Sequence, residues 1–149
     1  MNPDFYDLLV ELLASDASFL VVGAHALAAH GAPRSTNDID VWVKPTFENA
    51  ERVWRALLAF GAPVQALGVT IEDLHTPDMV VQIGQPPRRI DVMTGVSGLP
   101  SFEQAWERRL VGRVGAIDVP FLGREDFLVN KRASGRHKDL GDVDALGGE

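Results

Sequence analysis

The sequence predicts a mixed α/β (α+β) fold in which one small sheet is backed by helices. Two strands are indicated directly by residue type. Phe19–Val22 is a short, wholly apolar run that ends at a glycine, and Asp38–Val43 is β-branched and alternates polar with apolar residues at its start. Residues 79–83 and Arg89–Met93 are predicted to pair antiparallel, because a Gly-Gln-Pro-Pro segment between them favours a turn. Segments with helical spacing separate these strands, so the sheet is predicted to be mixed.

The helices are predicted from apolar spacing and from capping residues. Thr46 precedes a segment whose apolar residues fall on one helix face, and Gly61 follows it, so a helix is predicted between them. Asn2 or Asp4 can cap an N-terminal helix that carries an apolar stripe. The remaining predicted elements are helices over residues 24–30, 101–108, 124–134 and 138–146, a ribbon of residues 110–114 and 116–122 turning at Gly115, and a helical turn or loop at 71–74.

Composition and charge limit the functional classes. A chain of 149 residues fits one domain over residues 1–149. The absence of cysteine excludes disulfides, thiolate metal sites and a cysteine nucleophile. The N-terminus lacks the pattern of a signal peptide, and no apolar run approaches the ~20 residues of a membrane span. A net charge of -7 disfavours a broad nucleic-acid surface. We therefore expect a soluble, cytoplasmic protein with no membrane partner.

The strongest candidate for a functional site combines Gly23 with Asp38 and Asp40. Side chains two apart on a strand point to the same face, so the two aspartates project together while Ile39 enters the core. Adjacent carboxylates repel unless a cation lies between them, and Mg²⁺ held by carboxylates and substrate phosphates meets that need. Gly23 follows a buried strand and opens a helix, where backbone N–H groups and the helix dipole favour a phosphate. This combination is typical of phosphoryl or nucleotidyl transfer.

Asp91 is a candidate third carboxylate. It lies within Arg89–Met93 with an apolar residue on each side. If this strand neighbours the strand with the other two acids, the three carboxylates can bind two cations ~3.5–4 Å apart, one activating a hydroxyl and one on the phosphates. Asp91 would then be the base or the ligand nearest the nucleophile. The alternative is an edge-strand acid paired with Arg88 or Arg89.

These residues resemble the signature of the DNA polymerase beta-like nucleotidyltransferase superfamily. That signature is a hydrophobic residue, Gly, then Gly or Ser, a gap of nine to thirteen residues, and Asp, hydrophobic, Asp or Glu, hydrophobic. Here it reads Gly23-Ala24, a thirteen-residue gap, and Asp38-Ile39-Asp40-Val41. The string from residue 23 to 40 and the tail from residue 126 to 142 are similar to small stand-alone bacterial members related to AbiEii-type toxins.

The resemblance implies a nucleotidyltransferase fold and a Mg²⁺-dependent transfer of an NMP from an NTP to a hydroxyl, with two Mg²⁺ ions and release of pyrophosphate. It implies that Asp38, Asp40 and Asp91 are catalytic and hold the metal. The implied nucleotide-binding residues are Gly23, Ala24, Arg34, Ser35, Thr36 and Lys131.

Ala24 departs from the family pattern. The family has Gly or Ser at this position, and the Ser hydroxyl bonds a phosphate oxygen. Loss of one hydrogen bond to a charged partner is worth roughly 1.5–3 kcal/mol, which weakens NTP binding without abolishing it. A hydroxyl of Ser35 or Thr36 is a possible replacement.

The basic residues near the end of the sequence have two interpretations. The basic cluster of Lys131, Arg132, Arg136, His137 and Lys138 either stabilises a helix C-terminus or contacts polyphosphate or RNA. Lys131 is its best functional candidate.

Two pairs of residues are predicted to have no role in the site. Asp142 and Asp144 repeat the acidic spacing, but residues two apart on a helix do not share a face, so we interpret both as solvated charge. His25 and His30 are five apart and are predicted to pack or hydrogen-bond locally and not to form a metal pair.

Three functions remain open on the sequence. The first is an active nucleotidyltransferase whose acceptor is an RNA end such as that of tRNA, a protein side chain or a small molecule. The second is a degenerate module that binds nucleotide or protein without turnover, and the third is the neutralising component of a toxin–antitoxin pair. A homodimer and a complex with a cognate partner protein are both compatible with the sequence.

Overall fold

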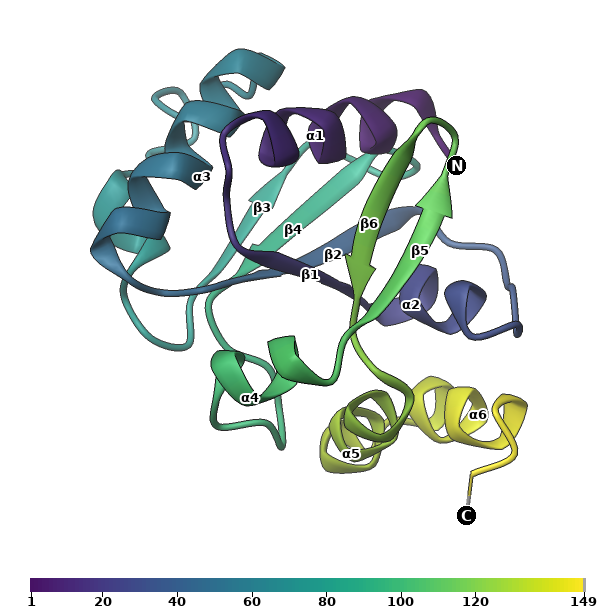
Figure 1. The fold of residues 1–149 in the computed structure, drawn as a ribbon. Helices are drawn as coiled ribbons and strands as arrows, with labels where there is room; N and C mark the ends of the chain where they lie inside the picture. Colours follow the sequence, from purple (N-terminus) through teal and green to yellow (C-terminus); the bar gives the residue numbers. More distant parts are fainter. Residues whose placement is uncertain (149) are drawn as a thin grey trace.

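The computed structural model describes residues 1–148, and its centre is a six-stranded mixed sheet (Figure 1). The strands lie in the order β3-β4-β2-β1-β6-β5. Their bounds are β1 Phe19–Val22, β2 Asp38–Val43, β3 Val80–Ile83, β4 Arg89–Met93, β5 Leu110–Val114 and β6 Ile117–Phe121. The helices are α1 Pro3–Ala14, α2 Gly23–Ala29, α3 Phe47–Phe60, α4 Phe102–Glu107, α5 Arg124–Ser134 and α6 His137–Ala145, with a 3₁₀ turn η1 at Ile71–Leu74. The predicted α/β class is confirmed.

The pairing of the central strands determines where the polar residues meet. β1 pairs antiparallel with β2 and parallel with β6, while β2 pairs parallel with β4. The two predicted hairpins are present as antiparallel β3–β4 and β5–β6. In this register Val22 lies opposite Asp40, and Asp40 lies opposite Asp91. The end of β1 and the acidic positions of β2 and β4 therefore share one place in the sheet.

The helix ends follow the capping residues. Asn2 caps α1, its Oδ1 accepting a hydrogen bond of 2.8 Å from the Asp4 backbone N–H. Thr46 caps α3, its Oγ1 accepting from the Asn49 N–H at 3.3 Å, and Gly61 ends the helix in the left-handed conformation with φ 92°. In these short elements the local sequence and the final conformation agree.

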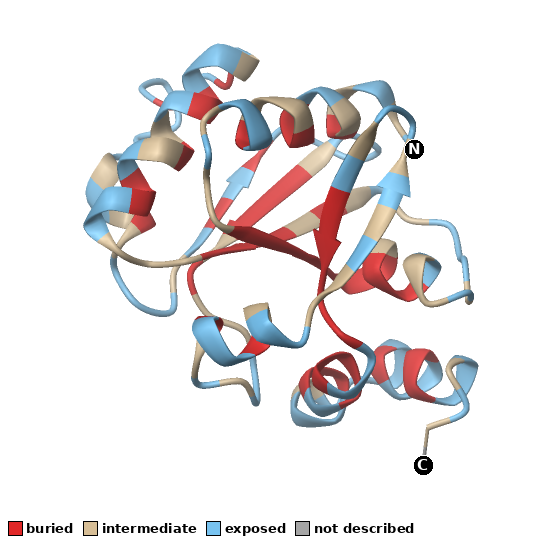
Figure 2. Cartoon of the chain, viewed as in Figure 1, coloured by how far each residue is buried: buried red, intermediate tan, exposed pale blue. Residues whose placement is uncertain are grey.

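Buried side chains concentrate on β1 and on the faces of the helices that meet the sheet (Figure 2). All four residues of β1 are buried, as expected for a strand with neighbours on both edges and helices nearby. α1 and α3 pack together on one side of the sheet, and α5 and α6 form a pair on the other side (Figure 1). The site described below lies between the sheet and this second pair.

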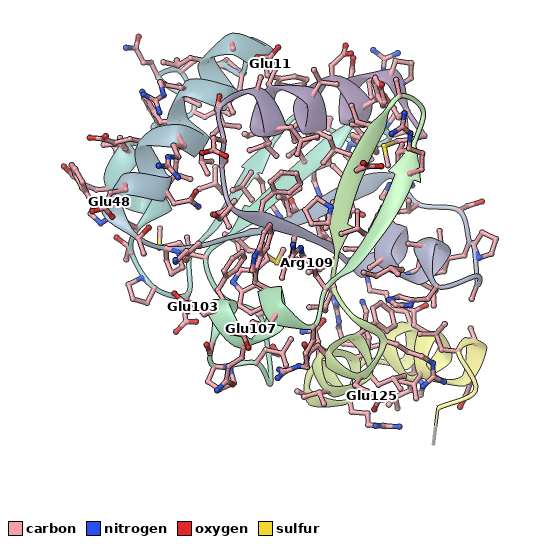
Figure 3. All side chains as sticks on the ribbon, in the orientation of Figure 1. Glu11, Glu48, Glu103, Glu107, Arg109 and Glu125 are labelled. Atoms are coloured by element: carbon pink, nitrogen blue, oxygen red, sulfur yellow. The ribbon has the colours of Figure 1, made fainter. Side chains whose placement is uncertain are left out.

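Several glutamates lie on the helices, away from the acidic residues of β2 and β4. Figure 3 labels Glu11 on α1, Glu48 on α3, Glu103 and Glu107 on α4, and Glu125 on α5, all near the outside of the molecule. Within residues 1–148, none of the helices combines the length and the apolar character needed to cross a membrane.

Candidate active site

Three carboxylates converge where β2 and β4 run side by side. Asp38 and Asp40 occupy alternate positions on β2, and Asp91 lies opposite Asp40 on β4. One carboxylate oxygen from each lies within 4.8 Å of the others, and Ile39 between the first two is fully buried. Asp91 itself is buried, and β4 has neighbours on both edges, so Asp91 is not an edge-strand acid, although the ion pair with Arg89 that this alternative included is present.

Arg89 supplies the positive charge within this acidic cluster. Its Nη2 donates to Asp38 Oδ2 at 2.7 Å and to Asp91 Oδ2 at 3.2 Å. A single nitrogen therefore bridges two of the three carboxylates, in the manner of a small cation. Asp91 Oδ1 is buried and has no hydrogen-bond partner among the described residues. Buried carboxylate oxygens normally have partners, so this oxygen is suited to a ligand.

The acidic cluster fits a hard divalent cation such as Mg²⁺. The donors are all carboxylate oxygens, the atoms that Mg²⁺ prefers, and one of them lacks a partner. Thr36 supports the arrangement, since its Oγ1 lies 3.0 Å from Asp38 Oδ1 and accepts from the Asp38 N–H at 3.3 Å. Asp38, Asp40 and Asp91 are the residues that would hold the ion.

Proximity of the three acids changes the acidity of Asp40. Burial, together with the negative charges of Asp38 and Asp91, raises the pKa of Asp40 to about 7, against an opposing effect of Lys131. In the absence of a cation, Asp40 is thus the carboxyl group that takes up a proton most readily near neutral pH. A bound cation would reverse this tendency by favouring the ionised form.

Gly23 is placed against Asp40 so closely that no side chain fits. Its φ of +67° is in the left-handed region, and a Cβ at this position would overlap Asp40 Oδ2. The sequence explains the position, because Gly23 directly follows β1 and begins α2. Backbone at the start of this helix therefore approaches the acidic cluster directly.

A cavity of about 310 Å³ opens beside the carboxylates. Five of the sequence-predicted nucleotide-binding residues line it: Ala24, Arg34, Ser35, Thr36 and Lys131. Gly23 lines a second cavity, of about 220 Å³, which also reaches Asp40. Asp40, Lys131 and Arg136 line both cavities. All the predicted site residues thus lie at one place, around the acidic cluster.

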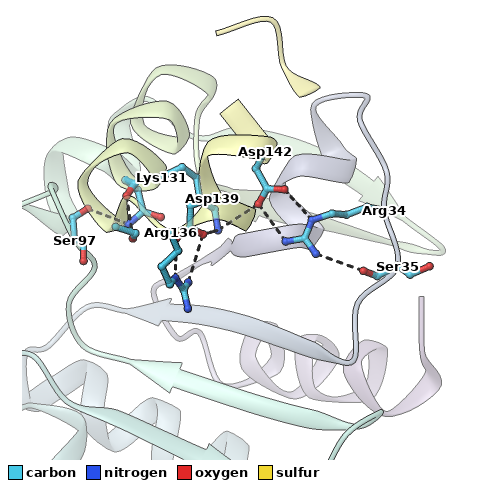
Figure 4. A network of polar contacts seen from close by, with 9 residues as sticks. Arg34, Ser35, Ser97, Lys131, Arg136, Asp139 and Asp142 are labelled. Carbon is cyan, nitrogen blue, oxygen red and sulfur yellow. Dashed lines mark hydrogen bonds and ion pairs between the residues drawn. The ribbon is translucent and has the colours of Figure 1, made fainter. Parts of the chain in front are cut away.

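Three of the basic residues that line the larger cavity are held by two buried aspartates of α6 (Figure 4). Arg34 makes a two-point ion pair with Asp142, at 2.8 and 3.1 Å. Arg136 contacts Asp139 at 2.7 Å. Lys131 Nζ lies between the aspartates, 3.3 Å from Asp139 and 3.6 Å from Asp142. Three cations from separate segments are thereby fixed by one helix.

A comparison with models of protein families identifies the family of the chain. The model of a family described as a nucleotidyltransferase of unknown function (DUF6036) matches residues 6–147. The chain belongs to this family. The expectation that the chain is a nucleotidyltransferase family member is confirmed, whereas the DNA polymerase beta-like superfamily and a closer relation to AbiEii-type toxins stay predictions. No curated protein matches the chain.

Two solved structures share the fold of this DUF6036 member. The lincosamide antibiotic adenylyltransferase LnuA, in its lincomycin-bound structure, has a TM-score of 0.63 and 11% sequence identity, covering 99% of this chain and 96% of its own. TM1012 of Thermotoga maritima, a candidate nucleotidyltransferase, has a TM-score of 0.57 and 14% identity, covering 99% of this chain and 91% of its own. At these identities the likeness shows the fold alone.

The structure corrects the interpretation of Asp142. We expected Asp142 and Asp144 to be solvated alike, but Asp142 is 3% exposed and paired with Arg34 and Lys131, whereas Asp144 is exposed. The helix argument holds, since the two residues lie on different faces of α6. It did not reveal that one of those faces is buried. Asp139, three residues before Asp142, lies on the same buried face.

Sequence reasoning also missed the roles of Arg89 and Arg136. Arg89 was considered only as a partner of Asp91, yet it bridges two acids and lines the larger cavity. A signal was present, because residues two apart on a strand share a face. Arg136 is exposed like its basic neighbour Arg132, but it contacts Asp139 and lines both cavities, which Arg132 does not. His25 packs edge-on against Phe5, and His30 Nε2 hydrogen-bonds with the Leu122 carbonyl, 92 residues away, so the predicted packing and hydrogen bonding are present but the partner of His30 is not local.

Proposed function

We propose that this chain is a Mg²⁺-dependent nucleotidyltransferase that moves an NMP from an NTP to a hydroxyl acceptor. The observation that carries the proposal is the pairing of two features at one place. Three carboxylates lie together on β2 and β4, and a cavity beside them is lined by basic side chains from three other segments. The first feature suits divalent cations and the second suits the phosphates they accompany.

The reaction divides among residues of this chain. Asp38, Asp40 and Asp91 hold the metal, which when bound supplies charge neutralisation at the phosphates and lowers the pKa of the attacking hydroxyl. The acceptor oxygen forms a bond to the α-phosphorus of the NTP, the bond from that phosphorus to the bridging oxygen of the β-phosphate breaks, and pyrophosphate leaves. The hydroxyl proton passes to Asp91, whose Oδ1 has no other partner among the described residues.

The triphosphate in this proposal lies in the larger cavity. Arg34, Lys131 and Arg136 line it and carry the charge that phosphate oxygens require. Ser35 also lines the cavity and offers a hydroxyl near Ala24. Thr36 is a poorer replacement, because its hydroxyl is engaged with Asp38. Ala24, which directly follows Gly23 in α2, lines the same cavity, so the backbone at the start of α2 borders the proposed triphosphate site.

A small hydroxylated molecule is the acceptor we favour. The second cavity, which Asp40 also lines, has a volume of about 220 Å³ and is lined by both apolar and polar side chains, among them Met93, Ser97 and Asn130. Its place next to the carboxylates would bring an acceptor hydroxyl to the α-phosphate. The net charge of -7 gives a large RNA little to bind over a broad surface. A tRNA end remains the alternative acceptor to test.

Thermal unfolding with nucleotides is the first test. Wild type and the Asp38→Asn/Asp40→Asn double variant are melted with ATP, GTP, CTP and UTP, with and without Mg²⁺. A ligand at 100 times its Kd adds about 2.7 kcal/mol, equivalent to several degrees for a chain of this size. The proposal expects a Mg²⁺-dependent rise in wild type that is lost in the double variant. No shift with any NTP would overturn it.

Pyrophosphate release then separates an enzyme from a nucleotide-binding module. Ala24, which lacks the hydroxyl of the family pattern, is the observation that favours the module. Mg²⁺-dependent pyrophosphate release in the presence of acceptor candidates supports the transferase. Nucleotide binding without release from any NTP, with small hydroxylated molecules and with tRNA, supports the module. A tight complex with another chain and no NTP binding would instead support a toxin–antitoxin role.

A further inference from the structure

The two buried aspartates of α6 do more than close the C-terminal helices onto the fold. Asp139 and Asp142 lie three residues apart, so they share one face of α6, and they are 0% and 3% exposed. Buried carboxylates are costly unless they are paired. Every ion pair that they make here is with a cation that lines the larger cavity.

Arg34 and Arg136 contact their aspartates through the same edge of the guanidinium group. Arg34 uses Nε and Nη2 to contact the two oxygens of Asp142, and Arg136 uses Nε and Nη2 to contact the two oxygens of Asp139. A guanidinium carries five N–H donors in a rigid plane, so a contact through this edge leaves the Nη1 edge for another ligand. Arg34 Nη1 makes only a long contact of 3.4 Å, to the Ser35 carbonyl, and Arg136 Nη1 has none recorded within residues 1–148.

The three cations come from different segments of the chain. Arg34 lies in the loop between α2 and β2, Lys131 in the last turn of α5, and Arg136 at the N-cap of α6. Long charged side chains of this kind lose considerable entropy when they are fixed. The two aspartates fix them before any ligand arrives, and three positive charges against two negative ones leave a surplus for an anion.

We propose that Asp139 and Asp142 are positioning residues for triphosphate binding: each holds an arginine by its Nε–Nη2 edge, and together they hold Lys131, so that the remaining N–H groups contact the phosphates. The inference rests on the proposed function, in that it takes the larger cavity as the triphosphate site. It adds that α6, which lines this cavity only through its first turn, determines the affinity for the nucleotide.

The proposal makes a prediction opposite in sign to that of simple electrostatics. Removing a carboxylate near a phosphate-binding cavity removes repulsion, so on charge alone Asp142→Asn should tighten the binding of a polyphosphate. If Asp142 positions Arg34 and Lys131, the same substitution should weaken binding. Asp144→Asn is the matched control, because Asp144 lies on the same helix, carries the same charge and is exposed.

The experiment measures the Kd of Mg²⁺-ATP and of inorganic tripolyphosphate by calorimetry for wild type, Asp142→Asn, Asp139→Asn and Asp144→Asn. We expect at least a tenfold weaker Kd for the first two variants and a change of less than twofold for Asp144→Asn. In steady-state assays the loss should fall on the KM for NTP, with a smaller effect on kcat. Binding by Asp142→Asn and Asp139→Asn that equals or exceeds that of wild type would overturn the inference.

A second variant covers the case in which Asp142→Asn does not fold. Arg34→Lys keeps the charge at a half-exposed side chain and removes the two-point contact with Asp142. It should weaken binding of both probes by a similar factor, and a Kd equal to that of wild type would count against the inference. Failure of wild type to bind either probe would overturn the proposed function as well, whereas wild-type binding with unaffected variants would overturn the positioning role alone.

Discussion

Asp40 and Asp91 are direct partners in the parallel pairing of β2 and β4, with Asp38 on the same face of β2. This register places like charges side by side in a partly buried site. Arg89 compensates Asp38 and Asp91, but no ion pair is recorded for Asp40 within residues 1–148. Burial, together with the negative charges of Asp38 and Asp91, therefore disfavours the ionised form of Asp40 and raises its pKa to about 7.

The first prediction concerns the pH dependence of stability in EDTA. The pKa of Asp40 is about 7 in the folded chain, above the ordinary value of 3.8 that applies to the unfolded one, so folding favours the protonated group. Its contribution to stability is complete below pH 3.8 and is lost as the pH rises through about 7. Between pH 5.5 and pH 8, wild type should lose about 1–2 kcal/mol from this group. Asp40→Asn should remove that part of the decline.

Urea unfolding at the two pH values checks this prediction, with Asp144→Asn as a control for loss of one exposed acid. Equal pH dependence in wild type and Asp40→Asn would show that Asp40 does not titrate in this range. Excess Mg²⁺ should flatten the wild-type profile, because a bound cation favours the ionised carboxyl group.

The second prediction concerns Arg89, which occupies the position of a cation between Asp38 and Asp91. Arg89→Gln leaves three carboxylates without this charge, so the melting temperature in EDTA should fall. The same change removes a competitor, so Mg²⁺ should raise the melting temperature of Arg89→Gln by more than that of wild type. Thermal unfolding in EDTA and in a Mg²⁺ series measures both effects.

Arg88→Gln is the control for the Arg89 variant. Arg88 is adjacent, exposed, and paired only with Asp4 outside the acidic cluster. It should leave the response to Mg²⁺ unchanged. An Arg89→Gln variant that responds to Mg²⁺ no more than wild type would show that the guanidinium does not compete with the ion.

The part of this site that the sequence predicts is the part that depends on local properties of the chain. Asp38 and Asp40 could be placed together because alternation on a strand is a local property, and Gly23 because it follows an apolar run directly. Asp91 joins them because β4 lies beside β2. Strand order is not a local property, so the sequence predicts this contact only on the condition that the two strands are neighbours. Asp142 is paired with Arg34, which is 108 residues away in the chain. No local pattern separates Asp142 from Asp144 in that respect.

The third prediction concerns Asn49, a buried polar residue of α3 that links three chain segments. Its Nδ2 donates to the carbonyls of Ser18 and Lys44, both at 2.9 Å, and its Oδ1 accepts from the Ser18 N–H at 2.7 Å. Asn49→Ala would leave the Ser18 N–H and the Lys44 carbonyl without these partners at the start of β1 and the end of β2, whereas the Ser18 carbonyl would keep its hydrogen bond of 3.2 Å from the Lys44 N–H. We expect a loss of about 2–4 kcal/mol in unfolding free energy.

Urea unfolding tests the Asn49 prediction, and Glu48→Ala provides the comparison. Glu48 precedes Asn49 in the first turn of α3 but is exposed, so its loss should cost no more than about 0.5 kcal/mol. A similar small effect for Asn49→Ala would mean that water replaces the three hydrogen bonds.

The fourth prediction separates backbone strain from close approach at Gly23. Gly23 and Gly61 both have positive φ, +67° and +92°, so an alanine at either position should cost about 1–2 kcal/mol. Only at Gly23 does the added Cβ meet a neighbour, Asp40 Oδ2, whereas nothing lies within 4 Å at Gly61. Gly23→Ala should therefore lower stability by more than Gly61→Ala does, and it alone should abolish the Mg²⁺-dependent stabilisation by NTP, because Asp40 must move.

The melting temperatures of the two variants with and without Mg²⁺-ATP give both quantities. If Gly23→Ala retained the nucleotide response of Gly61→Ala, the start of α2 would not be close enough to the acidic cluster to contact the same ligand.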